Sequence, residues 1–388
     1  MALTRTTKKN KSILILSATA GAGHVRAGDA LMDAAHIYFS GTEIHHEDIL
    51  NFTSPLFKKL YNDVYVSLVA ASPEFWGYLY NRAGHGQTSK KKSLLVKLFD
   101  QINYKKYLRV INELRPDAIL CTHFLPYLAI ADKIQSTGWN IPFFVATTDY
   151  DVHPLWIHPA VRRYYAASDE SAWTICSFGI PSEKIITTGI PIMPQFARHS
   201  TQRTARAALN LPEKMFTIMV LSGGYGIGII DKLVPSVAEF LHSFPKKRFQ
   251  LLIVCGKNRK LFGALSHISY PANVSVKLYP FVQNIDELMS ASDLLITKSG
   301  GLTVSEALAK HLPMIIFDPI PGQEARNAYY LLEHGAAMSA FNFPNLHYKV
   351  QTLIFHPDQL QAMRNAAGQI AHPDAAHDIL KDLLAHLY

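Results

Sequence analysis

Short apolar runs alternate with longer stretches of helical periodicity along almost the whole chain, and this pattern limits the fold more than any other feature. Alternation of this kind predicts parallel β-sheets covered by helices on both faces, and two successive sets of runs predict two doubly wound α/β domains. The expected strands are 12–18, 43–49, 117–121, 142–147, 162–166 and 185–188, then 216–222, 249–255, 274–278, 293–297, 313–317 and 336–340. The clearest expected helices are 25–39, 101–114, 229–243, 303–311 and 323–334.

The length and composition agree with two globular domains. The chain has 388 residues, of which 48% are hydrophobic and 18% charged; this is about twice the usual length of one domain. A glycine and two prolines interrupt regular structure at 189–194 and predict the boundary between the two domains. We therefore expect a first domain over 1–196, a second over 197–365, and a C-terminal helix over 366–388 that packs back on the first.

The sequence predicts neither a structural zinc site nor a membrane span. Its three cysteines, Cys121, Cys176 and Cys255, are odd in number and too far apart for zinc-ligand spacing. The basic start followed by SILILSATA imitates a signal peptide, but its apolar core has about five residues against the roughly 7–15 required. No segment reaches roughly 18 uninterrupted apolar residues. We expect a protein of the reducing cytoplasm, either free or bound to a membrane surface.

Most of the formal net charge of +8 comes from residues 52–110, where ten Lys and Arg face three acidic residues. Ten aromatic residues between positions 57 and 107 are interleaved with these cations. Such a segment suits an anionic bilayer interface, where aromatic rings lie at the headgroup level. It would also suit stacking on a single nucleic-acid strand, or it is a pair of amphipathic helices with a solvated basic face.

Three glycine-rich turns follow expected strands, at 21–28, 222–228 and 298–303. In open parallel sheets, ligands bind beyond the carboxyl ends of the strands, where such turns lead into helix N-termini. Two facing sheets would bring all three turns to one cleft.

The first turn, SATAGAGHVRAG, matches neither familiar nucleotide motif. A dinucleotide fingerprint fails at Arg26, where a third glycine or alanine is needed, and a Walker loop fails at Asp29, where lysine is needed. What remains is a histidine, His24, at the start of a helix. The helix dipole favours its neutral form, which suits a proton acceptor; the alternative is a histidine that only caps or packs.

The other two turns are better candidates for phosphate binding. The stretch SGGYGIG at 222–228 has four glycines and suits a closely approaching ligand. The backbone amides of Ser299, Gly300 and Gly301 favour an anion at the following helix start. Thr303 and Glu306 form a capping-box pattern, which would explain their spacing without a ligand. A polar cluster opens the next expected helix and contains Gln323, Glu324 and Asn327. Together these features indicate a nucleotide-sugar pocket.

An acidic triplet at Asp149–Tyr150–Asp151 imitates the metal-binding motif of another glycosyltransferase architecture. It lies in the expected first domain, opposite the glycine loops that would hold phosphates. We interpret it as part of the acceptor side and expect no metal site.

Several spaced motifs together resemble the processive diacylglycerol glucosyltransferases and monogalactosyldiacylglycerol synthases of glycosyltransferase family 28. The motifs are ILILSATAGAGH at 13–24, TTDYDVHPLWIHPAVRRYYAASD at 147–169, TGIPIMPQF at 188–196, KSGGLTVSEALA at 298–309 and PIPGQEARNA at 319–328. The resemblance implies the GT-B architecture, in which two facing Rossmann-like domains bind the acceptor and the UDP-sugar on opposite sides of an interdomain cleft.

The resemblance also implies roles for individual residues. His24 is then the catalytic base, and Gly23, Asp149 and His153 lie on the acceptor side. The implied donor residues are Gly223, Gly224 and Tyr225 near the diphosphate, Phe281 and Val282 beside the uracil, Lys298, Gly301, Leu302 and Thr303 at the phosphates, Glu306 at the ribose, and Gln323, Glu324 and Asn327 at the sugar. Ser299 replaces a proline that many relatives carry, and this change is expected to alter loop stiffness only.

The implied reaction is an inverting transfer of glucose or galactose from UDP-glucose or UDP-galactose to diacylglycerol. It needs no obligatory metal or other cofactor and no nucleic acid. The segment 52–110 would then hold the enzyme to an anionic membrane, as a peripheral protein on the inner face of the cell membrane. Two alternatives remain: transfer of N-acetylglucosamine to a polyprenyl-linked acceptor, or a non-catalytic nucleotide-sugar sensor.

Overall fold

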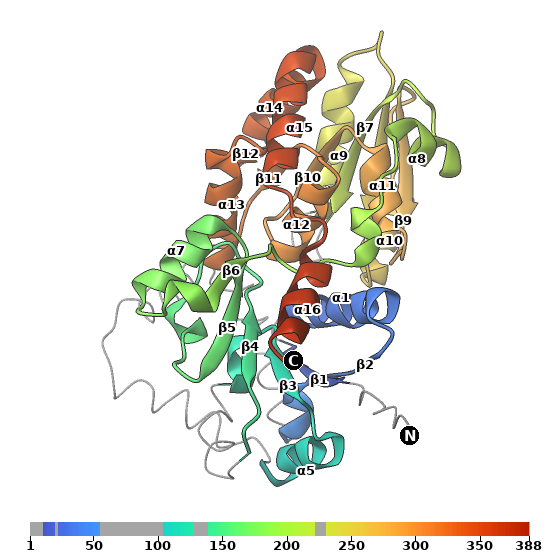
Figure 1. Ribbon diagram of the computed structural model, residues 1–388. Coiled ribbons are helices and arrows are strands. Elements are labelled where there is room, and N and C mark those ends of the chain that lie inside the picture. The colour runs from blue at the N-terminus through green and yellow to red at the C-terminus, as the bar shows by residue number, and fades with distance from the viewer. Residues whose placement is uncertain (1–10, 20–21, 55–103, 128–138, 222–229, 388) are drawn as a thin grey trace, which may run out of the picture.

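The computed structural model describes residues 11–19, 22–54, 104–127, 139–221 and 230–387. Over these residues the chain forms two α/β units, each built on one six-stranded parallel sheet (Figure 1). Each of the strands expected from the sequence is present, with its ends within one residue of the expected position. The predicted fold class, two doubly wound domains, is confirmed.

The first sheet has the strand order β2-β1-β3-β4-β5-β6. Neighbouring residues of β1 enter different cores: Ile13 and Ile15 pack on one face, whereas Leu14 and Leu16 pack on the other. This double burial explains why the strands are continuous apolar runs. The strands are β1 (Lys11–Ser17), β2 (Thr42–Asp48), β3 (Ala118–Cys121), β4 (Phe143–Ala146), β5 (Val161–Ala166) and β6 (Ile185–Thr187).

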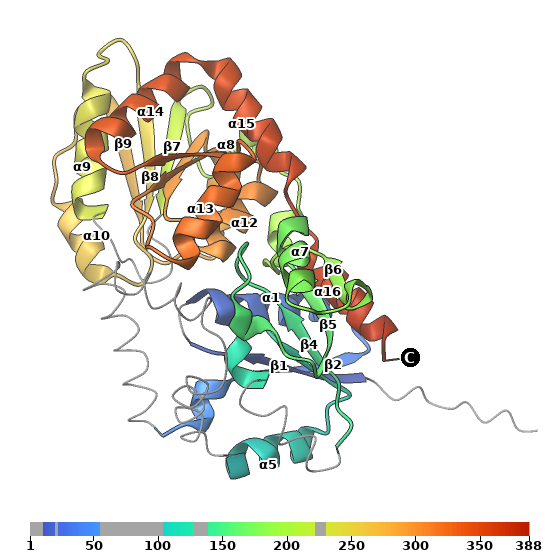
Figure 2. The same cartoon turned by 90° about the vertical axis from the view of Figure 1, so that its left-hand side faces the viewer.

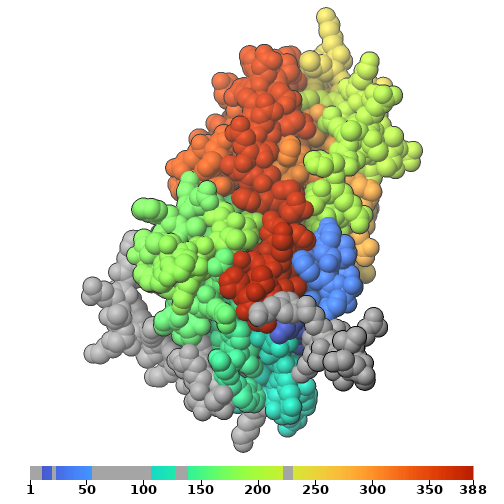
Figure 3. All heavy atoms as spheres, viewed as in Figure 1, coloured from blue at the N-terminus to red at the C-terminus, as the bar shows by residue number. Residues whose placement is uncertain are grey.

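Helices cover both faces of this first sheet. On one face α1 (Ala22–Tyr38) packs beside α16 (Ala375–Ala385), the last helix of the chain. The other face is covered by α5 (Tyr104–Leu114) and α7 (Asp169–Ser177). Figure 3 shows the C-terminal segment, in red, leaving the second unit and lying on the first, between α1 and the green segments.

The second sheet has the order β12-β11-β10-β7-β8-β9 and is also buried on both faces (Figure 2). Its strands are β7 (Phe216–Leu221), β8 (Phe249–Val254), β9 (Val274–Tyr279), β10 (Leu294–Thr297), β11 (Met314–Phe317) and β12 (Ala337–Ala340). The helices are α8 (Gln202–Ala208), α9 (Ile230–His242), α10 (Arg259–Ser266), α11 (Ile285–Ala291), α12 (Gly301–Ala309), α13 (Gln323–Glu333), α14 (Phe343–Phe355) and α15 (Pro357–Gln369).

One local expectation is wrong. Helix α12 begins at Gly301 with Gly300 as its N-cap, so Thr303 lies inside the first turn and does not cap the helix. The pattern Thr303 to Glu306 therefore is not a capping box. Gly300 enters the helix from extended backbone at φ −63° and ψ 131° without any side-chain cap, which leaves the first amides of α12 open to another partner.

The chain passes between the two units twice, and the two crossings touch. The first crossing contains Gly189, whose φ of 85° favours glycine. A Cβ atom at this position would collide with the side chain of His372, which lies on the return crossing between α15 and α16. The two crossings therefore lie side by side.

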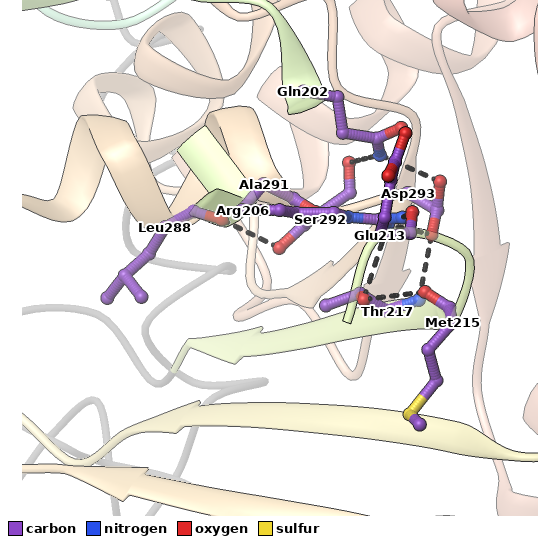
Figure 4. A network of polar contacts seen from close by, with 9 residues as sticks. All are labelled: Gln202, Arg206, Glu213, Met215, Thr217, Leu288, Ala291, Ser292 and Asp293. Carbon is purple, nitrogen blue, oxygen red and sulfur yellow. Dashed lines mark hydrogen bonds and ion pairs between the residues drawn. The ribbon is translucent and has the colours of Figure 1, made fainter. Parts of the chain in front are cut away.

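A buried polar network ties the segment after the first crossing to the second unit (Figure 4). Arg206 on α8 forms an ion pair with Asp293 at 2.7 Å and donates to the carbonyl oxygen of Ala291. Asp293 also accepts from the backbone nitrogen of Thr217, the second residue of β7. Because Arg206 is only 5% exposed, its charge depends on these partners.

We predict that Arg206→Ala lowers the free energy of unfolding by about 3–5 kcal/mol, because it leaves the carboxylate of Asp293 without its buried cation. The matched control is Arg203→Ala on the same helix, since Arg203 is 81% exposed and faces Glu213 at 3.4 Å. That variant should change stability by less than about 1 kcal/mol. Urea unfolding measures both, and equal losses would contradict the assignment.

Candidate functional site

The carboxyl ends of the two sheets meet at one interdomain junction. The first unit contributes the start of α1 and the residues after β3 and β4, and the second contributes the residues after β10 and β11. Ala27 of α1 and Tyr150 pack in the same apolar cluster as Leu302 of α12 and Ala328 of α13. Two segments that the sequence singled out as ligand-binding turns, 21–28 and 298–303, therefore lie at one place.

His24 lies in the first turn of α1, and its ring is held by two partners from neighbouring strands. Its Nδ1 atom lies 3.1 Å from the carbonyl oxygen of Thr122 and 2.7 Å from Oγ1 of Thr148. The hydroxyl of Thr122 donates in turn to the carbonyl oxygen of His24, at 2.8 Å. Because a carbonyl oxygen only accepts, these contacts assign the proton to Nδ1 and leave the lone pair on Nε2.

Burial lowers the pKa of His24 to about 4, and the contact with Thr122 opposes this only in part. The imidazole is therefore neutral at pH 7. A neutral ring with a fixed tautomer is the form that accepts a proton, so the geometry agrees with a general base.

A second histidine, His123, lies beside the first, although no sequence motif singled it out. The ring centroids of His24 and His123 are 4.5 Å apart, in an edge-on arrangement. His123 accepts a hydrogen bond from the backbone nitrogen of Leu125 on its Nδ1 atom, and burial lowers its pKa. Trp156 packs at 6.2 Å from the ring of His123. The sequence signal that could have identified His123 is its position just after β3, at the carboxyl edge of the sheet.

The start of α12 packs directly against the first unit. Gly301 lies under the carbonyl oxygen of Thr148, where any Cβ atom would collide with that oxygen. Leu302 is buried and reaches toward Gly23, to within 3.5 Å of where a Cβ atom would be. Lys298 is partly exposed at the entry to this turn. The open amides of α12 and a lysine thus lie next to the helix that carries His24.

Ser299, at the position of the missing proline, is completely buried. Its hydroxyl donates to the carbonyl oxygen of Glu324 at 2.6 Å, which ties the turn before α12 to the start of α13. The carboxylate of Glu324 accepts from the backbone nitrogen of Ile320, and burial raises its pKa. Gln323 is partly buried at the first position of α13.

Asn327 is completely buried and joins the two units. Its amide nitrogen donates to Asp149 at 3.0 Å and to the carbonyl oxygen of Ser299, and its oxygen accepts from the backbone nitrogen of Tyr150. Burial raises the pKa of Asp149 to about 7. In this arrangement Asn327 holds the acidic triplet, so a contact with a sugar would require it to exchange partners.

The two carboxylates of the acidic triplet both have partners on α13. Asp149 contacts Asn327, and Asp151 pairs with Arg326 at 2.7 Å. Across the described parts of the chain, no group of three or more His, Cys, Asp or Glu side chains is arranged to hold a metal ion.

The remaining predicted residues are spread around the junction. His153 is buried and caps the short 3₁₀ helix Pro154–Trp156 by accepting from the backbone nitrogen of Leu155. Phe281 is 53% exposed, with the ammonium of Lys257 at 5.9 Å from its ring centroid, and Val282 packs partly against the apolar cluster. Gly223, Gly224 and Tyr225 lie outside the described residues.

Most of the basic aromatic segment 52–110 also lies outside the described residues. Where it is described, Phe52 and Tyr107 are buried and pack edge to face, with ring centroids 5.1 Å apart. These two aromatics belong to the core of the first unit and are not available to a membrane. Helices long and apolar enough to cross a bilayer are absent from the described part of the chain.

Each of the two units matches a known protein family. Residues 24–192 match the family model of monogalactosyldiacylglycerol (MGDG) synthase, and residues 217–379 match that of the glycosyltransferase family 28 C-terminal domain. A processive diacylglycerol beta-glucosyltransferase of Bacillus cytotoxicus is 28% identical over 377 residues, which cover 97% of this chain and 94% of that protein.

Two solved structures show the same arrangement. MurG of Acinetobacter baumannii superposes with a TM-score of 0.63 at 16% identity, over 96% of this chain and 98% of that one. Anabaena Alr3699/HepE, solved in complex with UDP-glucose, gives a TM-score of 0.53 at 15% identity, over 96% and 99% of the two chains. At these identities the likeness concerns the fold.

Two parallel α/β units that meet at the carboxyl ends of their sheets form the GT-B architecture, and the family-model matches make the chain a glycosyltransferase. The two family matches follow one another along the chain, one on each unit. The chain belongs to the diacylglycerol glycosyltransferases of glycosyltransferase family 28.

We predict that Gly301→Ala lowers the free energy of unfolding by about 1–3 kcal/mol, because the added methyl group pushes α12 away from Thr148. Gly300→Ala is the control, since a Cβ atom there meets nothing within 4 Å. Chemical denaturation measures stability, and small-angle X-ray scattering reports whether the units separate. If both alanine variants lose the same stability, the close approach of Gly301 to Thr148 does not require glycine at this position.

Proposed function

We propose that this chain moves glucose or galactose from a UDP-sugar to the hydroxyl of diacylglycerol, with inversion at the anomeric carbon. The observation that carries the proposal is the neutral ring of His24, with Nδ1 held and Nε2 left as the base, next to the open N-terminus of α12. A base from one unit and an anion-binding helix end from the other are the two parts that a direct displacement needs.

In the proposed reaction the lipid hydroxyl oxygen attacks the anomeric carbon while the bond to the diphosphate oxygen breaks. His24 takes the hydroxyl proton on Nε2, which we expect to contribute roughly 10²–10⁴-fold to the rate. Because burial lowers its pKa to about 4, the imidazolium formed passes this proton on readily once product leaves.

The negative charge that develops on the leaving diphosphate falls, in this proposal, on groups of the second unit. The first amides of α12, from Gly301 to Thr303, point at an anion with the helix dipole behind them. Lys298 would add a cation, and the glycine turn expected from the sequence at 222–228 would supply further amides. No metal is obligatory in this scheme, since Asp149 and Asp151 are already engaged by α13.

The remaining donor contacts follow the family pattern. Phe281 and Val282 would flank the uracil, and Glu306 would bind the ribose hydroxyls. Gln323 and Glu324 would bind the sugar and discriminate glucose from galactose. The relatives are named as glucosyltransferases, which favours glucose as the donor sugar.

The acceptor follows from the same names, since those relatives are named for action on diacylglycerol. We propose that the enzyme reaches this lipid as a peripheral protein on the inner face of the cell membrane, through the basic segment 52–110. Ten cations against three acids in that segment would attract it to anionic lipid.

The proposed function is tested by incubating the protein with UDP-glucose, UDP-galactose and UDP-N-acetylglucosamine and with diacylglycerol in anionic vesicles, in parallel reactions with and without EDTA. Mass spectrometry should find a hexosyl-diacylglycerol, formed at the same rate with and without EDTA. Transfer of N-acetylglucosamine to an added polyprenyl-linked acceptor would favour the first alternative. Binding of a UDP-sugar without any transfer would favour a sensor.

We predict that His24→Gln lowers kcat by roughly 10²–10⁴-fold, because glutamine cannot accept the hydroxyl proton. His36→Gln is the matched control, since His36 lies on the same helix and is exposed. Initial rates and circular dichroism of both variants make the measurement. A folded His24→Gln enzyme with more than a third of the normal kcat would refute the base assignment.

A further inference from the structure

An ion pair joins the helix of the catalytic base to the carboxylate expected at the ribose. Nη2 of Arg26, on α1, lies 2.9 Å from Oε1 of Glu306, on α12. The Glu306 side chain is 5% exposed and that of Arg26 is 36% exposed, so the contact lies at the edge of the buried junction. In the sequence Arg26 is the residue that breaks a dinucleotide motif, and no local pattern there indicates a contact with Glu306.

The carboxylate of Glu306 is poorly supported without this arginine. Burial raises its pKa, and Arg26 is the group that most strongly opposes this shift. Among the described residues Oε1 has Arg26 as its partner, whereas Oε2 has no hydrogen bond. A buried carboxylate with one oxygen held by a guanidinium and the other unused is prepared to accept hydrogen bonds from a ligand.

The helix geometry gives Arg26 a different direction from His24. Residues two positions apart on an α-helix point about 200° apart around its axis. His24 accordingly turns to Thr122 and Thr148 of its own unit, and Arg26 turns to the second unit. One turn of α1 thus serves the acceptor with one side chain and the donor domain with the other.

We propose that Arg26 is a positioning residue for the donor, which fixes Glu306 through Oε1 and so presents Oε2 to the ribose diol of the nucleotide. This inference rests on the proposed function, because it takes a uridine nucleotide as the donor. Its consequence is that the ribose is bound fully only when α1 and α12 are together. Donor affinity is then tied to the arrangement that also brings His24 to the reaction.

A second arginine pair across the junction serves as the control for the pair of Arg26 and Glu306. Arg326 of α13 meets Asp151 of the first unit at 2.7 Å, with side-chain exposures of 38% and 26%. It has the same chemistry and also links the units, but it does not contact Glu306. A role that belongs only to holding the units together would be shared by both arginines.

The test is calorimetric binding of UDP and of 2′,3′-dideoxy-UDP to the full chain and to Arg26→Ala, Arg26→Lys and Arg326→Ala. The wild type should prefer UDP by roughly ten- to a hundredfold, as expected for hydrogen bonds to a carboxylate. Arg26→Ala should lose most of this preference, Arg26→Lys should keep part of it, and Arg326→Ala should keep it.

A pH series adds a readout that a structural contact would not move. Removing Arg26 raises the pKa of Glu306 further, so the affinity of Arg26→Ala for UDP should begin to fall at a higher pH on acidification than that of the wild type. The affinity for dideoxy-UDP should show no such difference between the two proteins.

Three results would overturn the inference. Arg26→Ala with an unchanged preference for UDP would show that Arg26 does not act through Glu306. Equal losses in Arg26→Ala and Arg326→Ala would assign both pairs to domain contact alone. Absence of UDP binding by the wild type would overturn both the inference and the proposed function, whereas normal UDP binding with an unchanged Arg26→Ala variant overturns the inference only.

Discussion

The site depends on the close contact that Thr148 makes with both units. Its hydroxyl lies 2.7 Å from Nδ1 of His24, and its carbonyl oxygen lies over Gly301 at the start of α12. One residue just after β4 therefore fixes the orientation of the proposed base and the position of the helix end that is proposed to bind the diphosphate. The other cross-domain contacts, from Arg26 to Glu306 and from Asn327 to Asp149, surround this point.

The fold could be predicted from the sequence because the strands and helices of a parallel sheet each produce a recognisable local sequence pattern. Strands buried on both faces are apolar runs, as Ile13 and Leu14 show by entering opposite cores. The rule that ligands bind at the carboxyl ends of parallel strands then located His24 and Gly301 without any knowledge of the contacts between them. Family resemblance added the roles, which single-sequence physics does not supply.

The pairings across the junction could not be predicted in this way. Arg26 and Glu306 are 280 positions apart, and no local pattern states that they meet. Tyr107 belongs to the basic aromatic segment that we expected at a membrane. It is nevertheless buried, because the side of α5 that carries it packs against the sheet. The capping-box pattern at Thr303 failed for a related reason: Gly301 fits beneath the carbonyl oxygen of Thr148, and the helix starts there, two residues before the expected position.

The central claim is a single displacement, with the base on one unit and the leaving group bound by the other. The anomeric configuration of the product tests it most directly. With UDP-α-glucose as donor and diacylglycerol as acceptor, the proton NMR spectrum of the purified glycolipid should show the large H1–H2 coupling of a β-glucoside. A product with the small coupling of an α-glucoside would contradict the account.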